Sequence, residues 1–460
     1  MRNLKIGWAQ RDMTPTRPVK LFGAMHLRVS RGVTDPLSVT ALALEREDEA
    51  AIFVACDLNN ITAELLAETR ARLKQIQPEI DGSRLILHST HTHTSLDYYG
   101  NEPNPPEAAE AMTGAECRAL VVAQAAEAAA AAWKNRAPGA VARGFGHAVV
   151  GHNRRAAYFD GSARMYGATD TPAFSQVEGY EDHGVHLLYF FDGEGRLTGV
   201  VVNLACPAQQ FEAEMTVSAD FWHDVRQELA RRFGPSIFLL PQCAPAGDQS
   251  PWLLVYDKLE DYMRQRRGLT RRQEISRRIT AVIEDVYAVV KDTASGDLPL
   301  IHHCETLELP GRVTTRADYE AAQADLQAAS AQKQKGWLRE RLPAVLASYA
   351  AGERKPPCPI ELHVIRLGDF VLATNPFELF LDYGMRIQAR SRAAQTFLIQ
   401  LANGISCYLP TEKAVGKHYG AMIQDNLVGP EGGQRLVERT LEIIAELFDP
   451  NHSTQSNKTS

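Results

Sequence analysis

The sequence lacks the cysteine patterns that build disulfide-rich domains or structural zinc sites. Its seven cysteines are scattered singly, at positions 56, 117, 206, 243, 304, 358 and 407. No Cys-x-x-Cys pair occurs and the count is odd, which argues against a disulfide framework and against a zinc ribbon. This cysteine usage is typical of a reducing compartment, so we expect a cytoplasmic protein.

Long apolar runs, a signal peptide and an excess of positive charge are also missing. No apolar stretch approaches the roughly 18 residues of a membrane span, and the N-terminus lacks the apolar core of a signal peptide. The net charge of −7 argues against nucleic acid as a partner. With 45% hydrophobic and 23% charged residues the chain is globular. We expect a small-molecule substrate, and the sequence leaves the oligomeric state open.

Hydrophobic periodicity predicts both strands and helices. The predicted strands are 38–44, 50–57, 84–87, 140–150, 184–191, 196–204, 236–240, 360–367, 370–374 and 396–402. The predicted helices are 62–77, 108–137, 220–233, most of 254–290, 379–391 and 433–447. The order strand, helix, strand indicates an α/β fold with a mixed β-sheet core and flanking helices.

One catalytic domain is predicted over 1–449, with an insertion inside it. Residues 317–351 are rich in Ala, Gln, Lys and Glu and predict a helical hairpin broken near Gly336. This insertion is either a lid or a packed structural pair of helices, and the second interpretation is favoured. The polar tail 450–460 is predicted to be disordered.

The most informative segment follows the apolar run at 84–87. Residues 88–95 read His-Ser-Thr-His-Thr-His-Thr-Ser, and His91 and His93 would point the same way if the chain stays extended. Imidazole is the commonest metal ligand and an acid or base near neutral pH. Open α/β sheets place their sites where strands feed loops. A polar loop whose histidines only form hydrogen bonds is the alternative, but this pattern favours a metal or catalytic site.

Other polar loops follow apolar strands in the same way, and one such segment leads into a helix. These segments are 151–155, 203–209, 243–251, 375–378 and 403–408. Polar side chains gathered at the ends of adjacent strands would form a single site. A constrained turn holds Ser250, but it lacks the flanking glycines of the Gly-x-Ser-x-Gly elbow, so we infer no serine hydrolase. No glycine-rich phosphate loop is present.

The order of these motifs resembles the catalytic domain of neutral, non-lysosomal ceramidases and their bacterial relatives, over about residues 1–445. Each motif alone is weak, but six in the right order are more specific. The matching elements are Asp12-Met-Thr-Pro15, Thr90-His-Thr-His-Thr94, Asn153-Arg154, Gly247-Asp-Gln-Ser-Pro251, Pro376-Phe-Glu378 and the stretch from Asn403 to Thr411.

The resemblance implies a zinc amidase in which a metal-bound hydroxide cleaves an N-acyl bond. Histidine, carboxylate and phenolate suit Zn²⁺ and leave a position open for water. Among the residues that match by position, His93 and Arg154 would stabilise the oxyanion or move protons, and Ser250 would hydrogen-bond the substrate. The implied zinc ligands are His91, Glu378 and Tyr408.

The chain departs from the family at one expected ligand. The family usually has a histidine in an Asn-Phe-Ala-Cys-His-Pro-like loop, and Pro207 stands at that place here. Proline cannot ligate a metal through its side chain. Either another group replaces the histidine, or the metal differs, or the site is inactive. The candidate replacements are Cys206, Gln209, Glu212, His183 and His223.

The substrate is predicted to be more polar than ceramide. No signal peptide or C-terminal immunoglobulin-like domain is expected, and the loop 151–167 is crowded with polar donors. A sugar or amino-acid conjugate would suit such a loop. Two alternatives stay open: a metal-dependent hydrolase of an ester or glycosidic bond, and a catalytically silent binding protein of the same fold.

Overall fold

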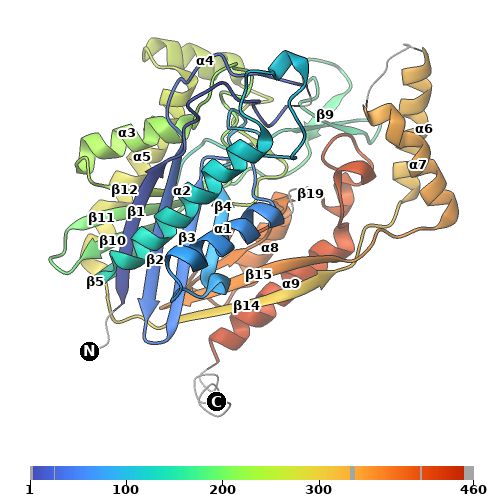
Figure 1. Ribbon diagram of the computed structural model, residues 1–460. Helices are drawn as coiled ribbons and strands as arrows, with labels where there is room; N and C mark the ends of the chain where they lie inside the picture. Colours follow the sequence, from blue (N-terminus) through green and yellow to red (C-terminus); the bar gives the residue numbers. More distant parts are fainter. Residues whose placement is uncertain (1–3, 25, 332–336, 405–406, 450–460) are drawn as a thin grey trace.

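Two β-sheets lie face to face in the computed structural model of this protein, and helices cover the outer face of each sheet (Figure 1). The structure describes residues 4–24, 26–331, 337–404 and 407–449. The predicted α/β class with a mixed core is confirmed, with most of the strands divided between the two sheets.

The larger sheet has eight strands in the order β12-β11-β10-β5-β1-β2-β3-β4. The outer pairs β3–β4 and β11–β12 are parallel, and the pairs between them are antiparallel. The predicted hairpin at 38–57 is confirmed as β2 and β3. The strand bounds are β1 Lys5–Asp12, β2 Ser38–Arg46, β3 Glu49–Cys56, β4 Leu85–Ser89, β5 Ala137–His147, β10 Gly184–Asp192, β11 Leu197–Leu204 and β12 Phe238–Cys243.

The second sheet has the order β14-β15-β16-β18, and its last pair is parallel. The predicted hairpin at 360–374 is confirmed as β15 and β16. No strand was predicted for β1 or β14, and both are long strands. The bounds are β14 Leu300–Leu309, β15 Cys358–Leu367, β16 Phe370–Thr374 and β18 Gln395–Ile399.

An apolar core fills the space between the sheets. Side chains alternate faces along a strand, so each sheet presents one apolar row to the other. Phe53 and Ile86 of the first sheet belong to the same buried cluster as Phe370 and Phe397 of the second. This burial is the main reason why the two sheets stay together.

Three pairs of helices cover the outer faces. The pair α1 and α2 packs on β1–β4, the pair α3 and α5 packs on β10–β12, and the pair α8 and α9 packs on the second sheet. The helix bounds are α1 Ala63–Ile76, α2 Gly114–Lys134, α3 Phe221–Phe233, α4 Asp257–Arg266, α5 Arg271–Val290, α8 Leu381–Arg390 and α9 Pro430–Leu447.

The helix predicted at 108–137 begins later than its composition suggested. α2 starts at Gly114 because Thr113 forms a capping box with Glu116, in which each side chain accepts from the other residue's backbone N–H. A short 3₁₀ turn at Pro106–Ala108 precedes it. The alanine-rich composition therefore predicted that a helix is present, and the capping box determines at which residue it begins.

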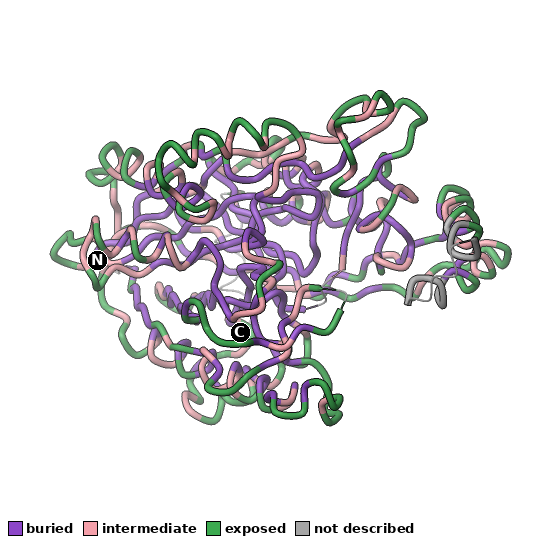
Figure 2. Tube along the Cα trace, turned by 90° about the horizontal axis from the view of Figure 1, so that it is seen from above, coloured by how far each residue is buried: buried purple, intermediate pink, exposed green. Residues whose placement is uncertain are grey.

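The predicted helical pair at 317–351 is present as α6 (Arg316–Ala331) and α7 (Trp337–Ala351). It stands away from the layered body, which Figure 2 shows from above. The predicted break at Gly336 and the predicted disordered tail 450–460 lie outside the described residues. In the described part of the chain, no helix combines the length and apolar character that a membrane span needs.

The loops after several strands meet at one edge of the layered body. Backbone hydrogen bonds join the loop after β4 to the loop after β11, from Ala208 N to Thr90 O at 3.3 Å. Another joins the loop after β18 to the end of β12, from Gln400 N to Cys243 O at 3.0 Å. Short pairings complete this edge: β6 (His152–Asn153) with β13 (Gln249–Ser250), and β17 (Glu378–Leu379) with β19 (Tyr408–Leu409). A small sheet of β7 (Arg155–Tyr158), β8 (Ala163–Met165) and β9 (Phe174–Val177) lies beside them.

Candidate active site

The histidine loop turns sharply instead of continuing the strand. His91 has φ 64°, in the left-handed region, so the extended geometry considered for His91 and His93 is not what brings them together. Their rings still meet edge to face, with centroids 4.8 Å apart and Nε2 atoms 3.4 Å apart. Such backbone strain costs on the order of 1–3 kcal/mol and clusters at functional sites.

A backbone carbonyl determines which nitrogen of His91 carries the hydrogen. Nδ1 lies 2.6 Å from the carbonyl oxygen of Asn59, which can only accept, so Nδ1 donates. The free lone pair of a neutral ring is then on Nε2, which lies 3.4 Å from Glu378 Oε2. This is the orientation in which a histidine presents Nε2 to a metal.

Strand pairing places Glu378 beside Tyr408. The two residues are direct partners in the parallel β17–β19 pair, so their side chains lie on the same face and interact. Burial alone would raise the pKa of Glu378, but His91, Arg154 and Tyr408 hold it below its usual value. Burial, with Glu378 adding to the effect, raises the pKa of the Tyr408 phenol well above its usual value. Glu378 is therefore ionised and Tyr408 protonated in the protein alone.

A buried guanidinium closes one side of the site. Arg154 is 2% exposed and donates to Gly247 O at 2.9 Å and to Tyr408 Oη at 3.3 Å. Its Nη2 lies 3.9 Å from Glu378 Oε2. Burial would lower the pKa of Arg154, but the neighbouring phenols and Glu378 raise this pKa by more than burial lowers it. The positive charge is therefore permanent.

Ser250 reaches the site only through another residue. Its Oγ accepts from Trp252 N at 3.1 Å and from Tyr166 Oη at 3.0 Å, and Tyr166 in turn accepts from Arg154 at 3.2 Å. The hydroxyl is fully buried and does not line the cavity in front of His91. In this geometry Ser250 supports Arg154 through Tyr166.

The loop that carries Pro207 directs two polar side chains at His93. Arg154 donates to Gln209 Oε1 at 3.2 Å, which fixes the amide so that its Nε2 donates to His93 Nε2 at 2.8 Å. The hydrogen of His93 is then on Nδ1, which lies 3.6 Å from Glu212 Oε2. Gln209 and Glu212 are therefore the candidate replacements from this loop that lie beside His93.

Two other candidate replacements point elsewhere. The Cys206 thiol donates to Val150 O at 3.3 Å, and burial raises its pKa well above the usual value. His183 lies 3.6 Å from Glu181, in a group with His152 that the site does not include. Neither residue is in contact with His91 or Glu378.

A cavity of about 370 Å³ opens in front of His91, Glu378 and Tyr408. Its size is at the lower end of the range for small-molecule sites. Most of its lining is polar or aromatic: Phe22, Asn59, Asn60, His91, His93, Tyr99, Glu378, Tyr408, Tyr419, Gln424 and Asp425 all contribute. Burial raises the pKa of Asp425 to about 6, which leaves it partly protonated near that pH.

Asn59 and Asn60 are among the lining residues that were not anticipated from the sequence. Asn59 orients His91, and Asn60 donates to the Tyr99 hydroxyl at 2.7 Å on the cavity wall. Both follow the apolar strand β3 in the same way as the other site loops follow theirs. That strand-to-loop format was the signal that could have found them.

The donor atoms fit the zinc ion that the resemblance implies. His91 Nε2 lies 3.4 Å from Glu378 Oε2, and both of these atoms are acceptors. Ligand atoms bound to a tetrahedral zinc at about 2.0–2.1 Å lie roughly 3.3 Å apart. A cation between them would relieve this meeting of acceptors. Nitrogen, carboxylate and phenol oxygen are ligands that Zn²⁺ accepts.

Comparisons with protein-family models and with curated proteins found no match. Solved structures do resemble the chain. The crystal structure of neutral ceramidase from Pseudomonas aeruginosa matches with a TM-score of 0.71 and 17% identity, over 97% of this chain and 75% of that one. A ceramidase structure described as complexed with C2 matches with a TM-score of 0.69, the same identity and the same coverage. The protein thus has a ceramidase-like fold along almost its whole described length.

Proposed function

We propose that this protein is a metal-dependent hydrolase that cleaves an amide bond of the N-acyl type. The observation that carries the proposal is the convergence of His91, Glu378 and Tyr408 on one cavity, with the buried Arg154 guanidinium directly behind Tyr408 and Glu378. The ceramidase-like fold supports the same reaction class. Within this proposal, zinc is held by the imidazole, the carboxylate and the phenol oxygen.

The protein's own residues would bind and polarise the substrate. When bound, zinc supplies a Lewis acid and lowers the pKa of a coordinated water to about 7. Arg154 carries a fixed positive charge 3.3 Å from Tyr408, so it can stabilise negative charge that develops on the carbonyl oxygen. His93, whose Nε2 lone pair accepts from Gln209 in the protein alone, could take a proton from water once that hydrogen bond opens and return it to the leaving amine.

Gln209 and Glu212 would make His93 suitable for this task. Gln209 donates to Nε2 and so keeps the hydrogen of neutral His93 on Nδ1, which lies 3.6 Å from Glu212 Oε2. A carboxylate at this position stabilises the imidazolium that forms when Nε2 takes up a proton. Burial raises the pKa of Glu212, whereas Arg154 and His91 oppose that rise.

We expect Glu212→Gln to lower kcat by about 10- to 100-fold, the usual effect of losing a group that orients a catalytic or ligating histidine. Zinc content and KM should change little, because Glu212 touches His93 and none of the proposed ligands. The matched control is Glu214→Gln, which changes an exposed carboxylate in the same loop and should leave kcat unchanged. Loss of zinc in Glu212→Gln would instead make Glu212 a metal ligand.

The cavity favours a polar acyl amide over ceramide. Amides, phenols and carboxylates line a space of about 370 Å³, beside the aromatic surface of Phe22 and Tyr99. N-acyl amino acids or N-acyl amino sugars offer hydrogen-bonding groups that these walls can bind.

A substrate screen of the zinc-loaded protein tests both parts of the proposal. We expect turnover of water-soluble N-acyl amino acids or amino sugars and weak or no turnover of long-chain ceramide. Cleavage of ceramide alone would refute the polar substrate. Cleavage only of matched esters or glycosides would refute the amide, and a zinc-loaded protein that turns over none of these compounds would point to a binding protein.

A further inference from the structure

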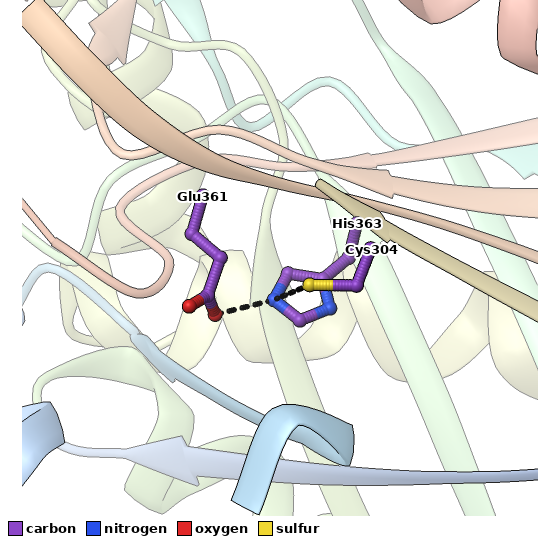
Figure 3. Close-up of side chains that lie close together, drawn as sticks. All are labelled: Cys304, Glu361 and His363. Atoms are coloured by element: carbon purple, nitrogen blue, oxygen red, sulfur yellow. Dashed lines mark hydrogen bonds and ion pairs between the residues drawn. The ribbon is translucent and has the colours of Figure 1, made fainter. Parts of the chain in front are cut away.

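A second group of metal-ligating side chains lies on the other sheet. Cys304 of β14 is the direct antiparallel partner of His363 of β15, and Glu361 precedes His363 by two residues, on the same face of the strand (Figure 3). No residue of this group takes part in the candidate active site. Strand pairing brings Cys304 and His363 together, although they are 59 residues apart in the sequence.

The ligand atoms are close enough to share one ion. The Cys304 sulfur, a Glu361 oxygen and a His363 nitrogen all lie within 4.8 Å of one another, and no other His, Cys, Asp and Glu group in the described part of the chain meets that criterion. Sγ of Cys304 is 3.8 Å from His363 Nε2. Sulfur and nitrogen bound to one tetrahedral zinc lie roughly 3.6 Å apart, so this pair needs little movement.

A chain of hydrogen bonds orients His363. His302 Nδ1 is 2.8 Å from Ala50 O and must donate to it, so the other nitrogen of neutral His302 is an acceptor. That acceptor lies 2.8 Å from His363 Nδ1, which must therefore carry a hydrogen. The remaining nitrogen of His363, Nε2, faces Cys304 and Glu361. Metal-bound histidines have this arrangement, with the second nitrogen donating to a fixed partner.

Two acceptors then meet where a cation could lie. His363 Nε2 is 2.6 Å from Glu361 Oε1, and both atoms are acceptors unless something positive lies between them. Asn403 Nδ2, whose orientation is fixed because its Oδ1 accepts from Leu87 N, is 2.8 Å from each of them. Asn403 and Arg70 thus already donate to these atoms, and what remains is the close approach of two acceptors, which a shared proton, or a metal ion that draws them apart, would relieve.

The surroundings hold the Glu361 carboxylate in place and leave a path by which an ion can enter. Arg70 donates to both oxygens of Glu361, at 2.6 and 2.8 Å. Cys304 and Glu361 are only partly buried, so a hydrated cation can reach them, whereas His363 is fully buried. The positive charge of Arg70 weakens cation binding, and ionisation of Cys304 compensates for it.

We propose that Cys304, Glu361 and His363 form a second metal site, for a thiophilic divalent cation of the Zn²⁺ or Co²⁺ type. Thiolate and imidazole select such ions over Mg²⁺ or Ca²⁺. On binding, the sulfur–hydrogen bond of Cys304 breaks, the proton goes to solvent, and the thiolate electron pair forms the sulfur–metal bond. A water completes the coordination.

Cobalt titration of the full-length protein distinguishes this site from the active site. Co²⁺ bound by a thiolate gives a charge-transfer band in the near ultraviolet, and the ligands proposed at the active site include no thiolate. We expect the band in the wild type and in His91→Ala, and its loss in Cys304→Ser. The matched control is Cys407→Ser, because Cys407 borders the active-site cavity, and this variant should keep the band.

His363→Gln provides a second test, since it removes the nitrogen and keeps the thiol. We expect it to weaken cobalt affinity at this site by at least 10-fold while circular dichroism stays unchanged. Absence of the band in folded wild type would overturn the proposal and leave a proton between His363 and Glu361. A band lost in Cys407→Ser but kept in Cys304→Ser would also overturn it.

Discussion

His91→Ala should abolish zinc binding at the candidate active site, whereas His93→Ala should keep the metal and lose activity. His91 presents an oriented Nε2 to Glu378 at 3.4 Å, and alanine leaves only oxygen donors there. His93 Nε2 already accepts from Gln209, so its removal takes away a proton carrier and leaves the proposed ligands in place. We expect kcat of His93→Ala to fall by about 10²- to 10³-fold, as after loss of a single oxyanion donor.

Elemental analysis on a Cys304→Ser background gives the measurement, because that change removes the second site proposed above. His91→Ala should then contain no zinc, and His93→Ala about as much as its parent. Equal loss in both variants would mean that His93 is itself a ligand. Full zinc retention in His91→Ala would refute the assigned ligand set.

Arg226→Ala should reduce the free energy of unfolding by about 3–5 kcal/mol, the usual effect of leaving one partner of a buried ion pair uncompensated. Arg226 of α3 donates to both oxygens of Asp57, at 2.8 and 2.9 Å, and Asp57 is fully buried. The same carboxylate accepts from Ser38 N and from the Thr90 hydroxyl, at the start of the histidine loop. The histidine loop should therefore become less ordered in the same variant.

Urea unfolding compares this variant with Arg231→Ala, which removes an exposed arginine from the same helix and should change stability little. Adding Asp57→Asn to Arg226→Ala should recover part of the loss, because no buried charge is then left unpaired. Equal stability of the two single arginine variants would show that the Asp57 pair contributes nothing net.

Local pattern was enough to locate most elements and most of the site segments. Alternation and amphipathic periodicity are properties of neighbouring residues, so the hairpin at 38–57, the helix at 62–77 and the helix at 220–233 could be predicted. The strand-to-loop format likewise identified the histidine loop and the segment at 375–378. The order of motifs led to the ceramidase-like fold, which the solved structures confirm.

Other features depend on which distant segments pair, and a single sequence carries little information about that. The strands separated into two sheets because apolar faces far apart in the chain bury one another. Glu378 meets Tyr408 only through the β17–β19 pairing. The left-handed turn at His91, the fixed amide of Gln209 and the meeting of Cys304 with His363 all come from hydrogen bonds between separate elements. The sequence by itself therefore determined which residues are candidates for the chemistry, and tertiary structure decided which of them touch, because hydrogen-bond geometry between segments exists only in the folded chain.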